Sequence, residues 1–133
     1  MGDCYRRALR EVMSGNRANA RLCHGWPVMS EHAPQWAGHR FGHAWVEYDH
    51  EVLSDELAEA MGMPHAVVVR YAYDPTTDTE IPAGMYRNAG RIEQVTVYTP
   101  EAAARLAVET RIAGPWTDDC PTDLPLANGD GFA

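Results

Sequence analysis

The chain has 133 residues and a formal net charge of −8, and all eleven of its basic residues are arginines. The length fits one domain, and 45% hydrophobic with 23% charged residues is typical of a folded globular protein, not a disordered one. The acidic balance argues against nucleic-acid binding by phosphate neutralisation, and the longest apolar run, residues 66–69, is too short to cross a membrane.

The N-terminal segment and the cysteines indicate the compartment. The first residues have the pattern of an amphipathic helix and lack the apolar run of a signal peptide, so we expect a cytoplasmic protein, in the host cytoplasm if it is phage-encoded. The chain has three cysteines, at positions 4, 23 and 120. An odd number of cysteines in a reducing compartment argues against a disulfide framework. Each cysteine is therefore a candidate core residue, ligand or nucleophile.

The first third of the chain predicts a helix and two strands. Apolar residues at helical spacing follow Asp3, a good N-cap, and the Ser-Gly-Asn sequence at 14–16 ends that helix. A short strand is predicted over 18–24, and a loop rich in Pro, Gly and His over 25–39. Residues 40–48 alternate as a strand does, with His43, Trp45 and Glu47 on one face.

The middle of the chain predicts a short helix and a strong strand. Ser54 is a suitable N-cap for a helix over 55–61, which has acidic residues in its first turn. Residues 66–73 form the clearest strand, and their Val-Val-Val run predicts burial on both faces. The Asp-Pro-Thr-Thr sequence at 74–77 closes this strand with a turn.

The last third predicts a helix over 83–89, a strand over 92–98 and a final helix that ends near Gly114-Pro115. Thr99 as N-cap and Pro100 at the first helical position mark the start of that final helix.

The order of these elements predicts the fold class and the domain organisation. A helix followed by strands interspersed with short helices indicates an α+β fold, not βαβ winding. We expect one domain over residues 1–116. Residues 117–133 are acidic and rich in Pro and Gly, and they predict a flexible tail.

Three residues have the chemistry of a nucleophilic site. Cys4 lies in the first turn of the predicted helix, where unpaired N–H groups and the helix dipole favour a thiolate. Such a nucleophile needs a base, and the base needs an orienting partner. His43 in mid-strand and Asp74 at the end of the next strand are the candidates for these two roles.

These residues lie in strings that resemble the transglutaminase-like superfamily of papain-like cysteine hydrolases. The strings are Gly2-Asp3-Cys4-Tyr5, the Arg-Leu-Cys-His-Gly sequence at 21–25, the Gly-His-Ala-Trp-Val-Glu sequence at 42–47, and Tyr73-Asp74-Pro75-Thr76. The resemblance implies a papain-like, transglutaminase-type core in which an N-terminal helix packs on an antiparallel sheet. It also implies that Cys4 is the nucleophile, His43 the general base and acid, and Asp74 the residue that orients His43.

The activity implied by the resemblance is that of a cysteine-dependent amide or isopeptide hydrolase, or of an acyltransferase, working through a thioester on Cys4. A protein or peptide, including a host protein, would be the substrate, and no cofactor is required. The reaction type follows from the three residues, whereas the choice between water and an amine as the acyl acceptor stays open.

The sequence departs from the family pattern in two ways, which lead to predictions about the oxyanion hole and about an inserted segment. Only three residues precede Cys4, so the oxyanion hole needs a donor from elsewhere, for which Trp26, Gln35 and Gln94 are candidates. His43 and Asp74 are 31 residues apart, which is longer than the short hairpin of the family. Residues 49–65 account for the excess and are interpreted as a helical lid over the site.

A zinc site is an alternative interpretation of the histidines and cysteines. Four potential ligands lie close together in sequence, namely Cys23, His24, His39 and His43. No Cys-x-x-Cys pair supports them, and the spacing of His39 and His43 suits a helix although a loop and a strand are predicted there. Glu47, on the same face as His43, is an ion-pair candidate.

A second alternative has no catalysis. The chain also resembles small proteins of actinobacteriophages, which suggests a phage-type module that binds and inhibits a host factor. Its contact surface would be acidic and would include the aromatic loop that contains Trp26, Pro27, Pro34 and Trp36. The absence of lysine is explained either by the codon bias of a GC-rich genome or by avoidance of self-modification in an enzyme of amide chemistry.

Overall fold

The structure, a computed structural model, describes residues 3–28, 39–64 and 67–116. Within these ranges the chain forms a five-stranded antiparallel sheet and four helices, which confirms the α+β class. In chain order the elements are α1 (Cys4–Met13), β1 (Arg21–Gly25), β2 (His43–Leu53), α2 (Asp55–Ala60), β3 (Val67–Asp74), β4 (Thr79–Pro82), α3 (Ala83–Ala89), β5 (Val95–Tyr98) and α4 (Pro100–Thr110). None of the helices in this part of the chain is long and apolar enough to cross a membrane.

The sheet has the strand order β4-β3-β2-β1-β5, and every neighbouring pair is antiparallel. Cys23 of β1 lies opposite Trp45 of β2, and Val46 of β2 lies opposite Tyr73 of β3. Because side chains alternate along a strand, Trp45 and Val46 belong to separate buried clusters on the two faces of the sheet. The predicted alternation is therefore confirmed for residues 43–48, whereas residues 40–42 precede β2.

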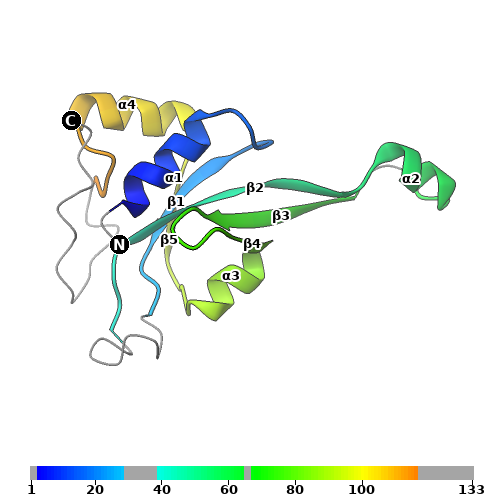
Figure 1. Cartoon of the computed structure of the whole chain (residues 1–133), viewed down its shortest axis with the longest axis horizontal. Helices are drawn as coiled ribbons and strands as arrows, with labels where there is room; N and C mark the ends of the chain where they lie inside the picture. The colour runs from blue at the N-terminus through cyan, green and yellow to red at the C-terminus, as the bar shows by residue number, and fades with distance from the viewer. Residues whose placement is uncertain (1–2, 29–38, 65–66, 117–133) are drawn as a thin grey trace.

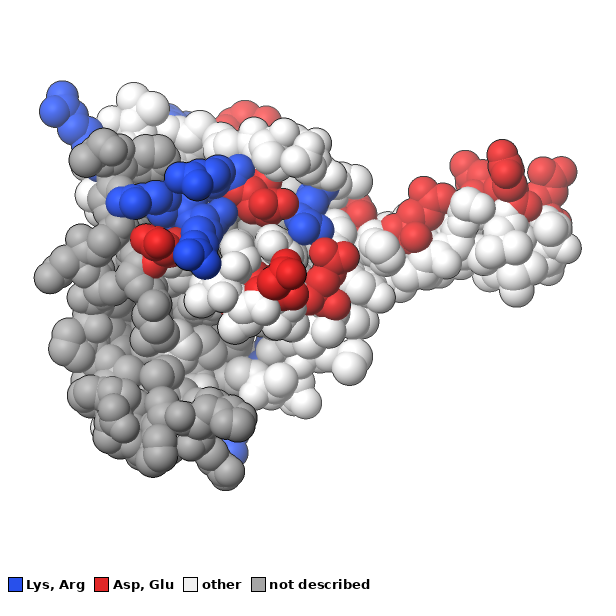
Figure 2. Space-filling view, in the orientation of Figure 1, with Lys and Arg blue, Asp and Glu red and all other residues white. Residues whose placement is uncertain are grey.

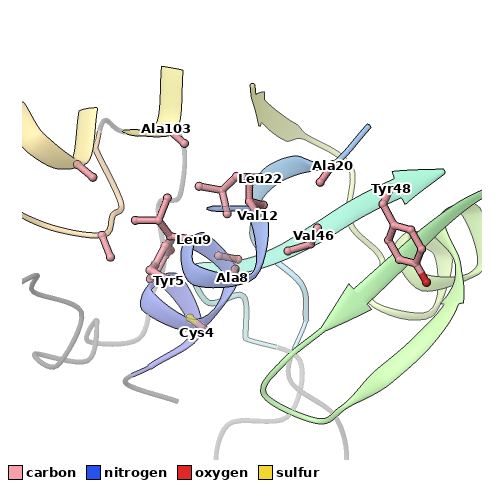
Figure 3. Close-up of a cluster of buried hydrophobic side chains, with 13 residues drawn as sticks. Cys4, Tyr5, Ala8, Leu9, Val12, Ala20, Leu22, Val46, Tyr48 and Ala103 are labelled. Carbon is pink, nitrogen blue, oxygen red and sulfur yellow. The ribbon is translucent and has the colours of Figure 1, made fainter. Parts of the chain in front are cut away.

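Helices cover both faces of the sheet (Figure 1). α1 and α4 pack on one face and enclose the larger cluster, in which Tyr5, Leu9 and Leu22 are at most 1% exposed (Figure 3). α3 covers the other face, where Trp45 and Ala83 are buried together. The triple-layer arrangement fixes the position of α1 relative to β1 and β2, and with it the position of the residue that begins α1.

Local signals explain the end of α1 and the start of α4, whereas the predicted end of the last helix near Gly114-Pro115 is wrong, because α4 ends at Thr110 and Arg111 follows in the left-handed conformation. α1 ends at Met13 with Ser14 as its C-cap residue, and Gly15 follows with a positive φ of 74°, as the Ser-Gly-Asn sequence predicts. The hydroxyl of Thr99 accepts a hydrogen bond from a backbone amide of the first turn of α4, and Pro100 occupies the first helical position. Asp3 is the N-cap residue of α1, but its side chain makes no capping hydrogen bond.

The hairpin of β2 and β3 extends well beyond the rest of the sheet and carries α2 at its tip (Figure 1). The interpretation of residues 49–65 as a lid is wrong. His43 and Leu53 are the two ends of β2, and at about 3.3 Å per residue they are separated by about 33 Å. The first part of that segment continues β2, and α2 therefore lies at the opposite end of the hairpin from His43.

The predicted burial of the valine run is also wrong. Val68 is 53% exposed, and both of its neighbours in β3 are only half-buried. The reason is that this half of β3 belongs to the extended hairpin, beyond the region that the other helices cover. β4 was not predicted, because its sequence Thr-Glu-Ile-Pro is short and ends in proline.

Some expectations fall on residues outside the described ranges. These are the tail over 117–133 with Cys120, and the loop residues Pro34, Gln35 and Trp36. The division into a domain over 1–116 and a tail stays a prediction.

Candidate active site

Cys4, His43 and Asp74 come from three elements that meet at one end of the sheet. Cys4 is the first residue of α1, His43 the first of β2 and Asp74 the last of β3. Because β2 and β3 are antiparallel, the start of one lies beside the end of the other. All three residues are buried, with exposures of 4%, 6% and 5%. The structure thus brings together the three residues that the sequence singled out.

His43 and Asp74 form a buried pair. Nε2 of His43 lies 2.8 Å from Oδ2 of Asp74. The Asp74 carboxylate also accepts a hydrogen bond from the Tyr86 hydroxyl at 2.7 Å and one from the Thr76 amide at 2.9 Å. Burial alone would raise the pKa of Asp74, but its bonds to His43, Tyr86 and Thr76 outweigh this effect and hold the pKa below its usual value.

The environment of His43 favours its charged form. Burial alone would lower the pKa of His43, but the hydrogen bond to Asp74 and the interaction with the Cys4 thiol raise it to about 9. Nδ1 of His43 is buried and makes no conventional hydrogen bond within the described part of the chain. Since Asp74 occupies Nε2, Nδ1 is the ring nitrogen available to the sulfur of Cys4.

Cys4 is held by the packing of α1. It belongs to the buried cluster together with Tyr5 and Ala8, and it lies at the N-terminal end of the helix (Figure 3). Ala8 is one helical turn further on and is fully buried. No acidic residue occupies the first turn of α1, so the backbone N–H groups of that turn, which have no acceptor within the helix, face no carboxylate from the turn itself.

Tyr86 is a site residue that the sequence analysis missed. It lies on α3, and its hydroxyl donates to the same oxygen of Asp74 that His43 contacts. Its ring contacts that of Trp45 at a centroid distance of 5.4 Å. Burial, and then the negative charge of Asp74, raise the pKa of Tyr86, so the hydroxyl keeps the proton that it donates. The helix over 83–89 was predicted, but nothing in its sequence showed that it covers Asp74.

Glu47 has a structural role on the same face of the sheet. Its carboxylate accepts two hydrogen bonds from the guanidinium of Arg87, at 2.7 and 2.8 Å, and one from the indole of Trp45 at 3.0 Å. Arg87 follows Tyr86 on α3, so this two-pronged ion pair fixes the helix that presents Tyr86 to Asp74. The ion-pair interpretation of Glu47 is confirmed.

The predicted zinc ligands are not brought together. Cys23 and His24 are neighbours on β1 and point to opposite faces of the sheet. Cys23 lies under α3, where burial raises the pKa of its thiol to about 12. His24 lies on the α1 face among aromatic rings, and His39 is exposed. Within the described ranges, no three His, Cys, Asp or Glu side chains form a group that could hold a metal ion.

The candidates for an oxyanion-hole donor lie in different surroundings. The indole of Trp26, just after β1, lies 5.7 Å from the guanidinium of Arg40. Gln94 is exposed in the segment between α3 and β5, and Gln35 falls outside the described residues. Phe41 is a neighbour of the site, since its ring centroid is 5.6 Å from that of His43.

No family model, curated protein or solved structure matches this chain. The residues of the site are therefore the basis for a functional proposal.

Proposed function

We propose that the chain is a cysteine-dependent amide or isopeptide hydrolase, or an acyltransferase, that forms a thioester on Cys4. The observation that carries the proposal is the buried His43–Asp74 pair, 2.8 Å apart, with Nδ1 of His43 left for the thiol at the start of α1. The order of contacts along this set, from sulfur to imidazole to carboxylate, supports the proposal because it is the order within a cysteine triad. The fold proposed with it is a papain-like, transglutaminase-type core.

The first half of the reaction forms the acyl-enzyme. The Cys4 thiolate attacks the amide carbonyl carbon, and the carbon–nitrogen bond then breaks as His43 gives its Nδ1 proton to the leaving amine. With a pKa of about 9, His43 carries that proton at neutral pH. The backbone N–H groups at the positive end of the α1 dipole would stabilise negative charge on the carbonyl oxygen.

The second half releases the product. Neutral His43 takes a proton from water or from an acceptor amine as it attacks the thioester carbonyl, and the carbon–sulfur bond breaks to restore the thiolate. Asp74 keeps the imidazole oriented in both halves, with the Tyr86 hydroxyl and the Thr76 amide fixing the carboxylate. The acceptor, water or amine, decides between hydrolysis and transfer. The substrate is a protein or peptide, and the proposed compartment is the cytoplasm.

The test is acyl transfer from an activated ester. p-Nitrophenyl acetate should acetylate Cys4 in preference to Cys23, with release of p-nitrophenolate, because His43 interacts with the Cys4 thiol, whereas burial raises the pKa of the Cys23 thiol to about 12. Peptide mass spectrometry should place the acetyl group on Cys4, and hydroxylamine should remove it, as expected for a thioester. His43→Ala should slow the acetylation at least tenfold.

Two results would contradict the proposal. One is a Cys4→Ala protein that releases p-nitrophenolate as fast as the wild type. The other is equal acetylation of Cys4 in the wild type and in His43→Ala. Cys23→Ser serves as the matched control, because it removes a buried thiol of the same chain and should leave the reaction at Cys4 in place.

A second candidate function is that of a protein that binds a host factor without catalysis. It is favoured by one observation, the extended hairpin with exposed apolar side chains at its tip. A Cys4→Ala variant that keeps the full biological effect would decide for this alternative.

A further inference from the structure

The β2–β3 hairpin and α2 form an arm, defined here as residues 51–64 together with 67 and 68, that extends from the domain (Figure 1). Its tip is about 33 Å from His43 along β2, at about 3.3 Å per residue. The arm therefore contributes nothing to the site around Cys4. Its position indicates a role separate from that site.

The arm exposes large apolar side chains. Ten large hydrophobic residues of the described chain are exposed, and five of them lie on this short segment. They are Val52 (45% exposed), Leu57 (50%), Met61 (63%), Met63 (40%) and Val68 (53%). Single exposed apolar residues are ordinary, but a concentration of them on one protruding element marks an interaction surface.

The tip holds these side chains in a defined arrangement. The Ser54 hydroxyl accepts a hydrogen bond from the Leu57 amide at 3.2 Å and caps the start of α2. At the other end Gly62 has a positive φ of 77°, and the amide of Met63 donates to the carbonyl of Ala58 at 2.8 Å. This is a Schellman cap. Leu57 and Met61 are four residues apart and lie on one side of the helix. A tip capped at both ends loses little conformational entropy on binding.

The charge of the arm selects the partner. Residues 51–64 contain four carboxylates and neither lysine nor arginine. The four, all exposed, are Glu51, Asp55, Glu56 and Glu59. Figure 2 shows acidic side chains along one edge of the tip and uncharged side chains along the other. Like charges would oppose docking of this tip on a nucleic acid, on an anionic membrane or on the same tip of a second copy.

We propose that the arm docks on a second protein, through an apolar surface of that protein rimmed by lysine or arginine side chains. Leu57, Met61 and Met63 supply the apolar contact, in which methionine adapts to irregular surfaces. Glu56 and Glu59 supply the complementary charge. This binding is independent of the chemistry at Cys4, since the two regions are at opposite ends of β2.

The experiment uses the full chain and a probe of the proposed chemistry. The probe is a labelled synthetic amphipathic helix with leucine on one face and lysine on the other, followed by fluorescence anisotropy. The control peptide has glutamate in place of lysine. We expect saturable binding of the leucine–lysine peptide. Binding should be at least tenfold weaker with Leu57→Ser/Met61→Ser, and its salt dependence should be reduced with Glu56→Gln/Glu59→Gln. The matched control is Val108→Ser on α4, a residue 77% exposed, which should bind like the wild type.

Several results would overturn the proposal. They are no saturable binding of the leucine–lysine peptide, unchanged binding by Leu57→Ser/Met61→Ser, and equal binding of the glutamate peptide. Dimerisation in sedimentation velocity, or binding to phosphatidylcholine vesicles, that the same variant abolishes would assign the arm to a second copy or to lipid instead. Acetylation of Cys4 should be unchanged in this variant. Failure of the binding proposal for the arm can therefore be distinguished from failure of the catalytic proposal for Cys4.

Discussion

Strands β2 and β3 carry two regions of opposite character at their two ends. At one end His43 and Asp74 are buried, and Asp74 is hydrogen-bonded to three groups. At the other end Val52 and Val68 are half exposed beside α2. The difference follows from which part of the hairpin the helices cover. Where helices cover it, polar groups are buried and hydrogen-bonded in one geometry. Where no helix covers it, apolar side chains are exposed to solvent and available for contact with a partner.

The largest difference between the two regions should appear in their ion pairs. Asp74→Ala leaves His43 buried without its partner and should lower the free energy of unfolding by about 3–5 kcal/mol. The matched control is Asp49→Ala at the base of the arm, where Asp49 and Arg70 are 2.9 Å apart and about one-third exposed. That change should cost at most about 1 kcal/mol. Urea denaturation of both variants measures the difference, and equal losses would break the comparison.

The apolar residues of the two regions should differ next. Leu9 is 1% exposed in the core, so Leu9→Ala should lower the free energy of unfolding by about 2–5 kcal/mol. Leu57 is 50% exposed on the arm, and Leu57→Ala should change it by no more than about 0.5 kcal/mol. A large loss for Leu57→Ala in chemical denaturation would mean that the arm packs as core does.

The pH dependence of stability should be set by the buried pair. The pKa of His43 is raised from 6.5 to about 9, so its contribution is complete below pH 6.5 and is lost as the pH rises towards 9. The pKa of Asp74 is lowered from 3.8, so its contribution is present above pH 3.8 and is lost as the pH falls through the folded value. We therefore expect the free energy of unfolding to decline by up to about 3 kcal/mol on the alkaline side.

Thermal or urea denaturation between about pH 4 and pH 9 measures this decline. His43→Gln should remove it. His50→Gln at the base of the arm is the matched control and should leave it in place. An alkaline decline that is the same in His43→Gln and in the wild type would contradict the assignment.

The smallest effect concerns Tyr86, a positioning residue that acts through Asp74. Tyr86→Phe removes one hydrogen bond and should lower the free energy of unfolding by about 1 kcal/mol. Because that bond helps to lower the pKa of Asp74, the acid loss of stability should begin at a higher pH in the variant. Tyr73→Phe, which loses an exposed hydrogen bond to Asp78, should leave the acid limb unmoved. An acid limb that stays in place in Tyr86→Phe would leave Tyr86 a packing role only.

Local signals predicted much of the fold and little of its three-dimensional arrangement. The helix boundary at Ser14 and the start of α4 at Thr99 and Pro100 follow from cap residues, which act within one turn. The direction of the 49–65 segment does not follow from its sequence. Residues that extend β2 do so by pairing with β3, which is remote in sequence. The sequence of the segment by itself is equally compatible with a lid.

The site shows the same division. Cys4, His43 and Asp74 could be found because each lies in a short string of distinctive composition. Tyr86 could not, since its role depends on the Glu47–Arg87 ion pair that fixes α3 over the sheet, and that pair joins residues 40 positions apart. The zinc alternative failed for a related reason. Closeness in sequence placed Cys23 and His24 together, whereas strand alternation puts them on opposite faces.

The most direct test of the catalytic account is the rate of Cys4 alkylation by iodoacetamide at about pH 7, compared between the wild type and His43→Ala and resolved from Cys23 by peptide mass spectrometry. Because His43 is positively charged beside the sulfur, Cys4 of the wild type should react at least about tenfold faster than Cys4 of His43→Ala. It should also react faster than Cys23, whose thiol is fully buried. Equal rates for Cys4 in the wild type and in His43→Ala would contradict the account.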